Sequence, residues 1–297
     1  FQAEDGIRDR SPSRGLGDVY KRQLGYDALT TNTTGDHNTA LGMYALRYNL
    51  TGAHNTATGY KALTANTTGN YNTATGYFTL TANTTGEYNT AAGYYSLNAN
   101  TTGSHNTGYG YSALIGNTTG YGNTATGWRS LRANTTGAYN NASGYQSLTS
   151  NTVGNYNTGS GYRALYSTTT GDRNTALGMN AGDVITTGGN NVMLGSLTDP
   201  SAVDAENQIV IGYNTTGHGD NIAVIGNTSM TAWHPADDGG VDLGSSSYEF
   251  KDLYVDGVAY TDAIGFGAVA MTLPLSLIHI SEPTRRTPIS YAVFCLK

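Results

Sequence analysis

The sequence has 297 residues, a length that suggests one large domain or two small ones. Its composition is unusual for a globular enzyme, with 40 Gly and 23 Tyr, and only 12% of the residues are charged. The formal net charge of -6 gives no basic footprint, which argues against nucleic acid as a partner. No apolar run approaches the ~18–20 residues that cross a bilayer, so no membrane span is expected.

The two ends of the sequence resemble translated sequencing-library adapters. They are Phe1–Gln23 and Leu275–Lys297, and we interpret both as artefact, to be set aside before the fold is considered. The two segments also agree with each other. The sample index of such a library would be encoded at Arg10–Pro12 and again, as its reverse complement, at Arg286–Pro288, and the codons allowed at the two places are compatible with one index. The only cysteine lies in the second segment, so the remaining chain excludes thiol catalysis and a disulfide scaffold.

The region between these segments is built from 17-residue repeats. The tripeptide NTA or a close variant recurs within the consensus NTAxGYxALxxNTTGxx, starting at Asn38, Asn55, Asn72, Asn89, Asn106, Asn123, Asn140, Asn157, Asn174 and Asn191. An unbroken register is expected of a solenoid, in which each residue stacks on its equivalent about 4.8 Å away in the next coil. Helix is disfavoured because the segment lacks a 3.6-residue apolar period and is rich in Gly, Asn and Thr. The sequence therefore predicts an all-β parallel solenoid over residues 24–197.

The NTTG segments are interpreted as the corners of the coils. Glycine is expected to supply a positive φ there, and the Asn side chains are expected to hydrogen-bond from coil to coil. One Leu column, two small-residue columns and an aromatic column recur at constant positions, which is a thin core for one chain. A Leu or Tyr stripe left outside would be a long apolar patch, of the kind that marks an interface. This predicts a homotrimer, in which three chains bury the stripe around one axis.

The chain changes character after Leu197. The following residues, up to the second adapter-like segment, carry one basic and eleven acidic residues. The segments QIVIG and AVIG within it are typical of short strands, and their final glycines, Gly212 and Gly226, are one 14-residue step apart. We therefore expect the 17-residue coils to pass without a break into 14-residue coils over residues 198–235. An acidic stalk or junction is expected at residues 236–274.

This pattern resembles the repeats of known surface fibres. Residues 198–235 look like the heads of YadA-like trimeric autotransporter adhesins, which are left-handed parallel β-rolls, and the 17-residue units look like related repeats of surface adhesins and phage tail fibres. Val241–Gly257 (VDLGSSSYEFKDLYVDG) resembles the junction upstream of an endosialidase-type intramolecular chaperone in tail-fibre-like proteins. The resemblance implies an extracellular trimeric fibre, on a cell surface or a virion tail. Such a fibre attaches to a host or cell-surface glycan or protein.

No catalytic, cofactor or metal site is expected from the sequence. The acidic residues of the repeats are scattered and offer no carboxylate pair for glycoside hydrolysis, so the chain is not expected to be an enzyme. His37, His54 and His105 share one repeat position with tyrosines and are interpreted as a solvent-facing column, because no constant carboxylate lies beside them. Further along, a second group could ligate a hard cation, although loop solvation is the favoured interpretation: His218, Asp220, His234, Asp237 and Asp238.

The variable position after the Tyr column offers the candidate ligand-binding residues. They are aromatic or basic side chains, and the aromatic faces could stack on sugars: Tyr44, Lys61, Phe78, Tyr95, Arg129 and Arg163. The alternative is that these side chains only solvate the fibre. Ice binding is the alternative function, because a flat Thr-x-Thr array such as Thr56/Thr58 could face water. That array is interrupted in other coils, for example by Leu41 and Ala92.

Overall fold

The computed structural model describes residues 21–234 and seven positions beyond them, residues 243, 245, 247, 248, 250, 251 and 254. The chain divides into two compact units, Phe1–Trp233 and His234–Lys297, and each is considered by itself. In the second unit, the described residues include an isolated antiparallel bridge between Ser245 and Tyr248. Most of the acidic stalk or junction expected at residues 236–274 lies outside the described residues, as do residues 1–20 and 275–297.

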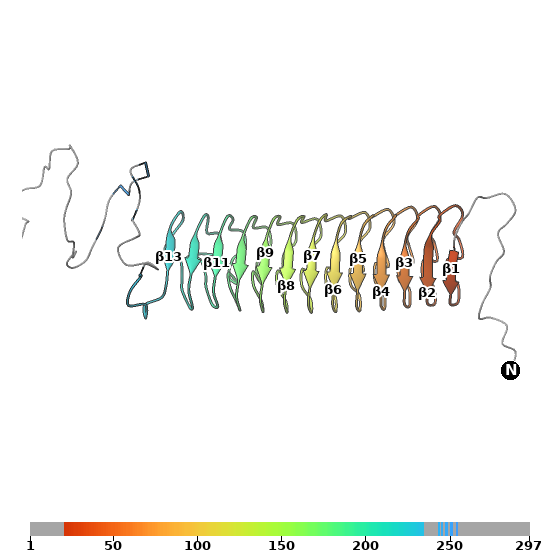
Figure 1. Cartoon of the computed structure of the whole chain (residues 1–297), viewed down its shortest axis with the longest axis horizontal. Coiled ribbons are helices and arrows are strands. Elements are labelled where there is room, and N and C mark those ends of the chain that lie inside the picture. Colours follow the sequence, from red (N-terminus) through yellow and green to blue (C-terminus); the bar gives the residue numbers. More distant parts are fainter. Residues whose placement is uncertain are drawn as a thin grey trace, which may run out of the picture. The chain divides into compact units, whose positions relative to one another are not determined.

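Thirteen short parallel strands form one sheet in the first unit. They lie side by side in sequence order, so each inner strand pairs with the strands of the coils before and after it (Figure 1). The strands are β1 (Lys21–Leu24), β2 (Asn38–Leu41), β3 (Thr56–Thr58), β4 (Thr73–Thr75), β5 (Thr90–Ala92), β6 (Thr107–Tyr109), β7 (Thr124–Thr126), β8 (Asn141–Ser143), β9 (Thr158–Ser160), β10 (Thr175–Leu177), β11 (Val192–Leu194), β12 (Ile209–Ile211) and β13 (Ala223–Ile225). The described part of the chain contains no helix, and hence none that could cross a membrane. The predicted all-β parallel solenoid is confirmed.

The strand register confirms the coil lengths read from the sequence. Thr56 of β3 pairs with Thr73 of β4, and Val192 of β11 pairs with Ile209 of β12, so each of these coils makes a 17-residue step. The last pair joins Ile209 of β12 to Ala223 of β13, which is a 14-residue step. The two coil types therefore share one continuous sheet.

The first strand includes three residues of the N-terminal segment that resembles an adapter. In β1, Arg22 pairs with Thr39 and Gln23 pairs with Ala40 of β2. A long basic and a long amide side chain thus stand where the repeat has Thr and Ala, although the backbone pairing is the same. Because parallel pairing is made by backbone groups, it is compatible with either origin of these residues, and the adapter interpretation stays a prediction.

The large apolar side chains of the core come from one leucine in each coil up to Leu165, and from Ile185, Met193 and Val210 further along the chain. These leucines are fully buried: Leu46, Leu63, Leu80, Leu97, Leu114, Leu131, Leu148 and Leu165. Alanines of the strand, such as Ala57, and of the position before the leucine, such as Ala62, belong to the same cluster. The tyrosine column faces outward instead, with Tyr77 and Tyr94 43% and 42% exposed. One chain therefore closes its own leucine core.

Two buried asparagine columns complete the interior. In the NTA column, the Asn72 side chain donates to the carbonyl oxygen of Gly86 (2.8 Å), and its Oδ1 accepts the N–H of Asn89 (3.0 Å). In the NTTG column, Asn66 Nδ2 donates to Asn49 Oδ1 of the preceding coil (2.7 Å). The expected asparagine ladder is confirmed. Because these amides are hydrogen-bonded from coil to coil, their burial stabilises the stack without further apolar volume.

The glycine of the NTTG corner is required for space, so the expectation of a positive φ there was wrong. A Cβ on Gly52 would lie 2.5 Å from the carbonyl oxygen of Gly69, with the Asn49 side chain also in contact. Positive φ occurs instead at the glycine that ends each strand, such as Gly59 (128°), and at non-glycine residues such as Lys61 (56°) and Leu63 (52°). A left-handed conformation costs an L-residue roughly 1–2 kcal/mol. Leucine burial and hydrogen bonds between coils offset this cost.

Candidate functional site

A column of outward-facing aromatic rings runs along the outside of the solenoid. We call it the aromatic ridge, and it consists of Tyr60, Tyr77, Tyr94, Tyr111, Trp128, Tyr145 and Tyr162. Each ring follows the glycine that ends a strand. At Gly76, for example, φ is 131° and a Cβ would meet the backbone of Gly93, so only glycine fits this turn. The stacked coils therefore place one ring above the next.

The rings of the ridge present their edges to solvent. Tyr77 and Tyr94 stack with their centroids 5.1 Å apart and their planes 5° from parallel, and Tyr94 and Tyr111 stack at 5.2 Å and 3°. Each inner ring therefore has a neighbouring ring against both of its faces. What remains accessible is the ring edge, which in tyrosine carries the hydroxyl group. The ridge offers a row of hydrogen-bonding groups rather than a row of stacking platforms.

The six predicted ligand-binding residues lie in one column beside this ridge, and all are half-buried. The column is interrupted by Ser112, which is only 5% exposed, so the six do not form one continuous patch. On one side of the interruption, Lys61 Nζ lies 5.1 Å from the ring centroid of Phe78 and 5.5 Å from that of Tyr60. Phe78 stacks on Tyr95 at 5.1 Å. Tyr44, the first of the six, packs edge-on against Tyr60 at 6.1 Å.

On the other side of the interruption, two arginines lie over aromatic rings. Arg129 Cζ is 4.2 Å from the centroid of the Trp128 ring, and Arg163 Cζ is 5.9 Å from that of Tyr162 and 4.4 Å from that of Tyr166. Such cation–π contacts hold the guanidinium groups against the rings. The structure thus brings Lys61, Arg129 and Arg163 to the side of the aromatic ridge.

A second column of rings lies at the position just before each NTA tripeptide. Its exposed members are His37, His54, Tyr71, Tyr88, His105, Tyr139 and Tyr156. His54 stacks on Tyr71 at 4.9 Å, and Tyr88 stacks on His105 at 4.8 Å. Gly122 interrupts the column after His105. The imidazoles therefore take the place of phenol rings in a stack, as expected for a solvent-facing column.

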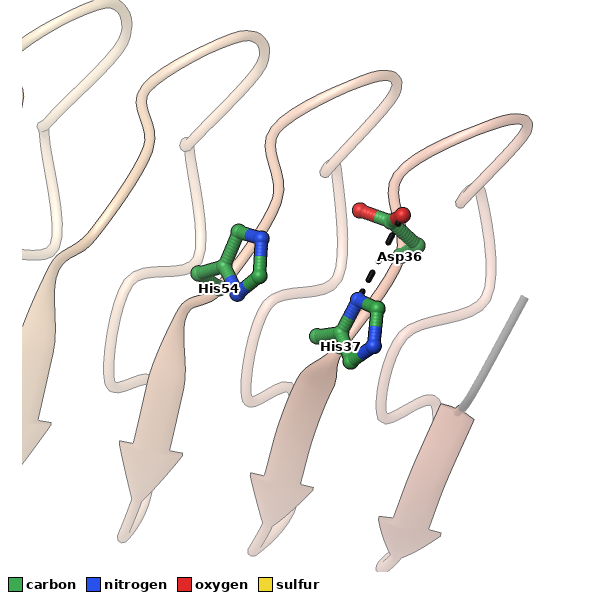
Figure 2. A group of neighbouring side chains, drawn as sticks. All are labelled: Asp36, His37 and His54. Carbon is green, nitrogen blue, oxygen red and sulfur yellow. Dashed lines mark ion pairs between the residues drawn. The ribbon is translucent and has the colours of Figure 1, made fainter. Parts of the chain in front are cut away.

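A carboxylate lies beside the first two imidazoles. Asp36 Oδ2 is 3.4 Å from His37 Nδ1, and the rings of His37 and His54 stack at 4.8 Å with their planes 3° from parallel (Figure 2). Each of the three residues offers one ligand atom within 4.8 Å of the other two. Within the described ranges this is the one group of three such side chains. The sequence alone does not reveal this group by a constant carboxylate, and its one signal there is that Asp36 directly precedes His37.

The second His/Asp group, for which loop solvation was the favoured interpretation, is described only in part. His218 and His234 are exposed and belong to no group of three ligands. Asp220 Oδ1 accepts the N–H of Glu206 (2.8 Å) and a bond from Gln208 Nε2 (3.2 Å), and these two bonds lower the pKa of Asp220. Its carboxylate therefore serves the coil structure. The remaining members, Asp237 and Asp238, lie outside the described residues.

Two carboxylates approach each other where the repeat changes. The pKa of Asp199 is raised to about 6, mainly by burial and also by the negative charge of the Asp183 carboxylate. Hydrogen bonds from the backbone N–H groups of Val184 and Asp183 lower this pKa and offset part of the rise. Burial also raises the pKa of Asp183, whereas the charge of Arg163 lowers it. This pair opposes folding when both groups are ionised.

The outer face of the sheet carries the threonines considered for ice binding. The first outward position of the strands is nearly continuous: Thr39, Thr56, Thr73, Thr90, Thr107, Thr124, Thr158 and Thr175, with Asn141 in one coil. The second outward position changes between Thr58, Leu41, Ala92 and Tyr109 in different coils. The face therefore has one regular threonine column and one irregular column.

Comparison with protein-family models finds no match, and no curated protein or solved structure matches the chain significantly. The fold defines the chain as a parallel β-solenoid repeat protein.

Proposed function

We propose that the chain is a structural and surface-binding segment of an extracellular adhesin or phage tail fibre, and that it attaches to a cell surface. The aromatic ridge carries this proposal, because it is a long, regular row of exposed side chains on a stack of hydrogen-bonded coils. A preorganised row loses little conformational freedom when it binds a partner. The proposed location is extracellular, at a cell surface or on a virion tail.

The chemistry of the ridge favours a glycan that carries hydroxyl and acidic groups. Tyrosine hydroxyls donate and accept hydrogen bonds, and they recur along the ridge at the ring spacing of 5.1–5.2 Å seen for Tyr77, Tyr94 and Tyr111. The cations of Lys61, Arg129 and Arg163 lie beside this row and would bind carboxylate or sulfate groups. Because neighbouring rings cover the ring faces, the proposed contact is made by ring edges and cations rather than by stacking on sugars.

The test removes hydroxyl groups without disturbing the stack. The triple variant Tyr77→Phe/Tyr94→Phe/Tyr111→Phe keeps every ring, and the matched control Tyr71→Phe/Tyr88→Phe/Tyr139→Phe makes the same change in the second ring column. Binding to glycan arrays and to intact cells is expected to weaken at least about tenfold in the ridge variant, since each lost hydrogen bond contributes about 0.5–1.5 kcal/mol. Equal binding by the two variants would exclude the ridge edge as the binding surface.

We also propose that three chains associate into a homotrimer. Each chain closes its own leucine core, and the aromatic ridge is an exposed apolar surface that can drive association. A trimer that buries the ridge competes with glycan binding by the same rings, so the two proposals are alternative uses of this surface. A solution mass of three chains, measured by light scattering, is expected. A stable monomer at micromolar concentration would contradict the trimer while leaving glycan binding by the ridge open to its own test.

Ice binding is a second candidate, favoured by the nearly continuous threonine column on the outer face of the sheet. Thr73 and Thr124, for example, are exposed and lie in equivalent positions of β4 and β7. If this face orders water, the protein shows thermal hysteresis, and replacing Thr73 and Thr124 by Tyr reduces it. Absence of hysteresis in the unmodified protein would remove this candidate.

A further inference from the structure

The first two complete coils place two imidazoles and one carboxylate together on the surface. His37 and His54 lie a full coil apart in the chain, yet their ring centroids are 4.8 Å apart because they occupy the same position of adjacent coils. Asp36 lies in the same coil as His37, and its carboxylate oxygen is 3.4 Å from His37 Nδ1 (Figure 2). The three ligand atoms all lie within 4.8 Å of one another.

We propose that Asp36, His37 and His54 bind one divalent first-row transition-metal ion, of which Zn²⁺ is the representative probe. Imidazole nitrogen and carboxylate oxygen are ordinary ligands of Zn²⁺ at about 2.0–2.2 Å. Two nitrogen ligands out of three disfavour Ca²⁺ and Mg²⁺, which take oxygen ligands. Three protein ligands leave one position of a tetrahedral ion open to water.

The side chains can reach a common ion at small cost. The stacked rings are further apart than two ligands of one ion, so both imidazoles must turn toward a shared point. The side chains of His37 and Asp36 are 49% and 42% exposed, which leaves room for that rotation. The backbone needs no change, because the N–H of His54 already donates to the carbonyl oxygen of Asp36 (3.0 Å) and fixes the two coils relative to each other.

The same column shows why this pair of coils differs from the others. His105 stacks on Tyr88 and lies against Tyr121, so no second imidazole is adjacent to it. The residue preceding His105 is Ser104, and the residue preceding His54 is Ala53. The conjunction of two adjacent imidazoles with a carboxylate is therefore confined, in the described part of the chain, to the coils that carry Asp36 and His54.

The bound ion cross-links two adjacent coils. It joins groups from successive turns of the chain, and unfolding separates those groups, so the ion binds the folded state more tightly than the unfolded state. Binding of this kind raises the stability of the folded chain in proportion to the logarithm of the free ion concentration. It is also weaker in acid, because the imidazoles must be unprotonated to bind the metal. This inference is independent of the proposed attachment function.

The test uses residues that the chain itself places in these columns. His54→Tyr introduces the ring found at Tyr71, and Asp36→Asn introduces the amide found at Asn70, so both variants keep the stack. His105→Tyr is the matched control, because it removes an imidazole from the same column away from the site. Zn²⁺ binding to the full chain is measured by titration calorimetry at about pH 7.5 and pH 5.5, together with the thermal unfolding temperature.

We expect one Zn²⁺ per chain, bound more weakly at the lower pH. His54→Tyr and Asp36→Asn are expected to weaken binding more than about tenfold, since even the loss of an outer hydrogen-bond partner of a metal ligand has this effect. Zn²⁺ is expected to raise the unfolding temperature of the unmodified chain and of His105→Tyr, and not that of His54→Tyr. Unchanged binding by His54→Tyr, an equal loss in His105→Tyr, no uptake by the unmodified chain, or Zn²⁺-dependent dimerisation would each overturn the proposal.

Discussion

The coils that carry the leucine column and the coils at the end of the sheet fill their interiors in opposite ways. In the leucine-containing coils the large side chain comes from the leucine column, as at Leu165, and the strand supplies alanine, as at Ala176. In the coil that leads to β11, Gly182 takes the leucine position and the strand supplies Met193. A Cβ on Gly182 would lie 3.0 Å from the Leu165 side chain and 3.3 Å from that of Met193. The large buried side chains of this coil are thus Met193 of the strand and Ile185, which is also fully buried, in place of a leucine.

The two regions also differ in how completely they are buried. Val210 of β12 is fully buried between neighbouring strands, whereas its equivalent Val224 of β13 is only half-buried. β13 is the edge strand of the sheet, so the columns of the repeat have no partner on one side there. The comparison indicates that the continuity of a column, more than the identity of the residue in it, determines burial.

The largest expected effect tests the leucine column. Leu114→Ala removes a fully buried side chain in the middle of the stack and is expected to lower the free energy of unfolding by about 2–5 kcal/mol. Val210→Ala removes fewer carbon atoms near the end of the sheet and is expected to cost less. Urea unfolding of both variants measures the difference. An equal or larger cost at Val210 would show that the end coils are packed as tightly as the middle ones.

The next largest loss of stability is expected when the asparagine ladder is interrupted. Asn117 Nδ2 donates to Asn100 Oδ1 (2.8 Å), and its Oδ1 accepts a bond from Asn134 Nδ2 (2.8 Å). Asn117→Ala removes these bonds in the interior and is expected to cost about 1–3 kcal/mol for each buried group left without a partner. Thr119→Ala, at an exposed position of the same coil, is the control and is expected to stay within about 0.5 kcal/mol. Similar stabilities of the two variants would mean that water replaces the ladder bonds.

A double-mutant cycle tests the exchange of core volume between the two regions. Gly182→Leu alone overfills the space beside Met193 and is expected to cost about 1–3 kcal/mol. Met193→Ala alone opens a cavity. The double variant restores the leucine and alanine of the leucine-containing coils, and it is expected to be more stable than the sum of the single changes by about 0.5–3 kcal/mol. Additive single effects, measured by urea unfolding, would show that the two positions do not share one space.

The smallest effect depends on pH. Because the pKa of Asp199 is about 6 in the folded protein and the ordinary value is 3.8, folding favours the protonated form. The stabilising contribution is therefore present below pH ~4 and is lost as the pH rises through about 6. Asp199→Asn is expected to raise the unfolding temperature at about pH 7.5 and to leave it unchanged at about pH 3.5. Asp204→Asn, at an exposed position, is the control; an equal shift in both variants would argue against a specific role of Asp199.

Several features of the fold follow from the repeat alone. Equivalent residues must stack if the chain coils with a constant period, so the partners of Thr56 and of Asn66 in the next coils could be named from spacing. The change of step before β13 followed in the same way from the positions of Gly212 and Gly226. The group of Asp36, His37 and His54 did not follow from the repeat. Asp36 is not a constant residue of the repeat, and a carboxylate lies beside two adjacent imidazoles in one coil alone of the described part of the chain.

The sequence by itself thus determined the coil length, the parallel sheet and the stacking partner of each residue, because a 17-residue period leaves one way to align successive coils. Only the tertiary structure decided which columns face inward. The leucine and asparagine side chains point into the core and the tyrosine side chains point outward. This follows because the backbone turns at non-glycine residues with positive φ, such as Lys61 and Leu63. A positive φ is disfavoured for L-residues in isolation. The residue types at these positions therefore do not indicate where the backbone adopts it. They persist because burial and hydrogen bonds from both neighbouring coils hold them in place.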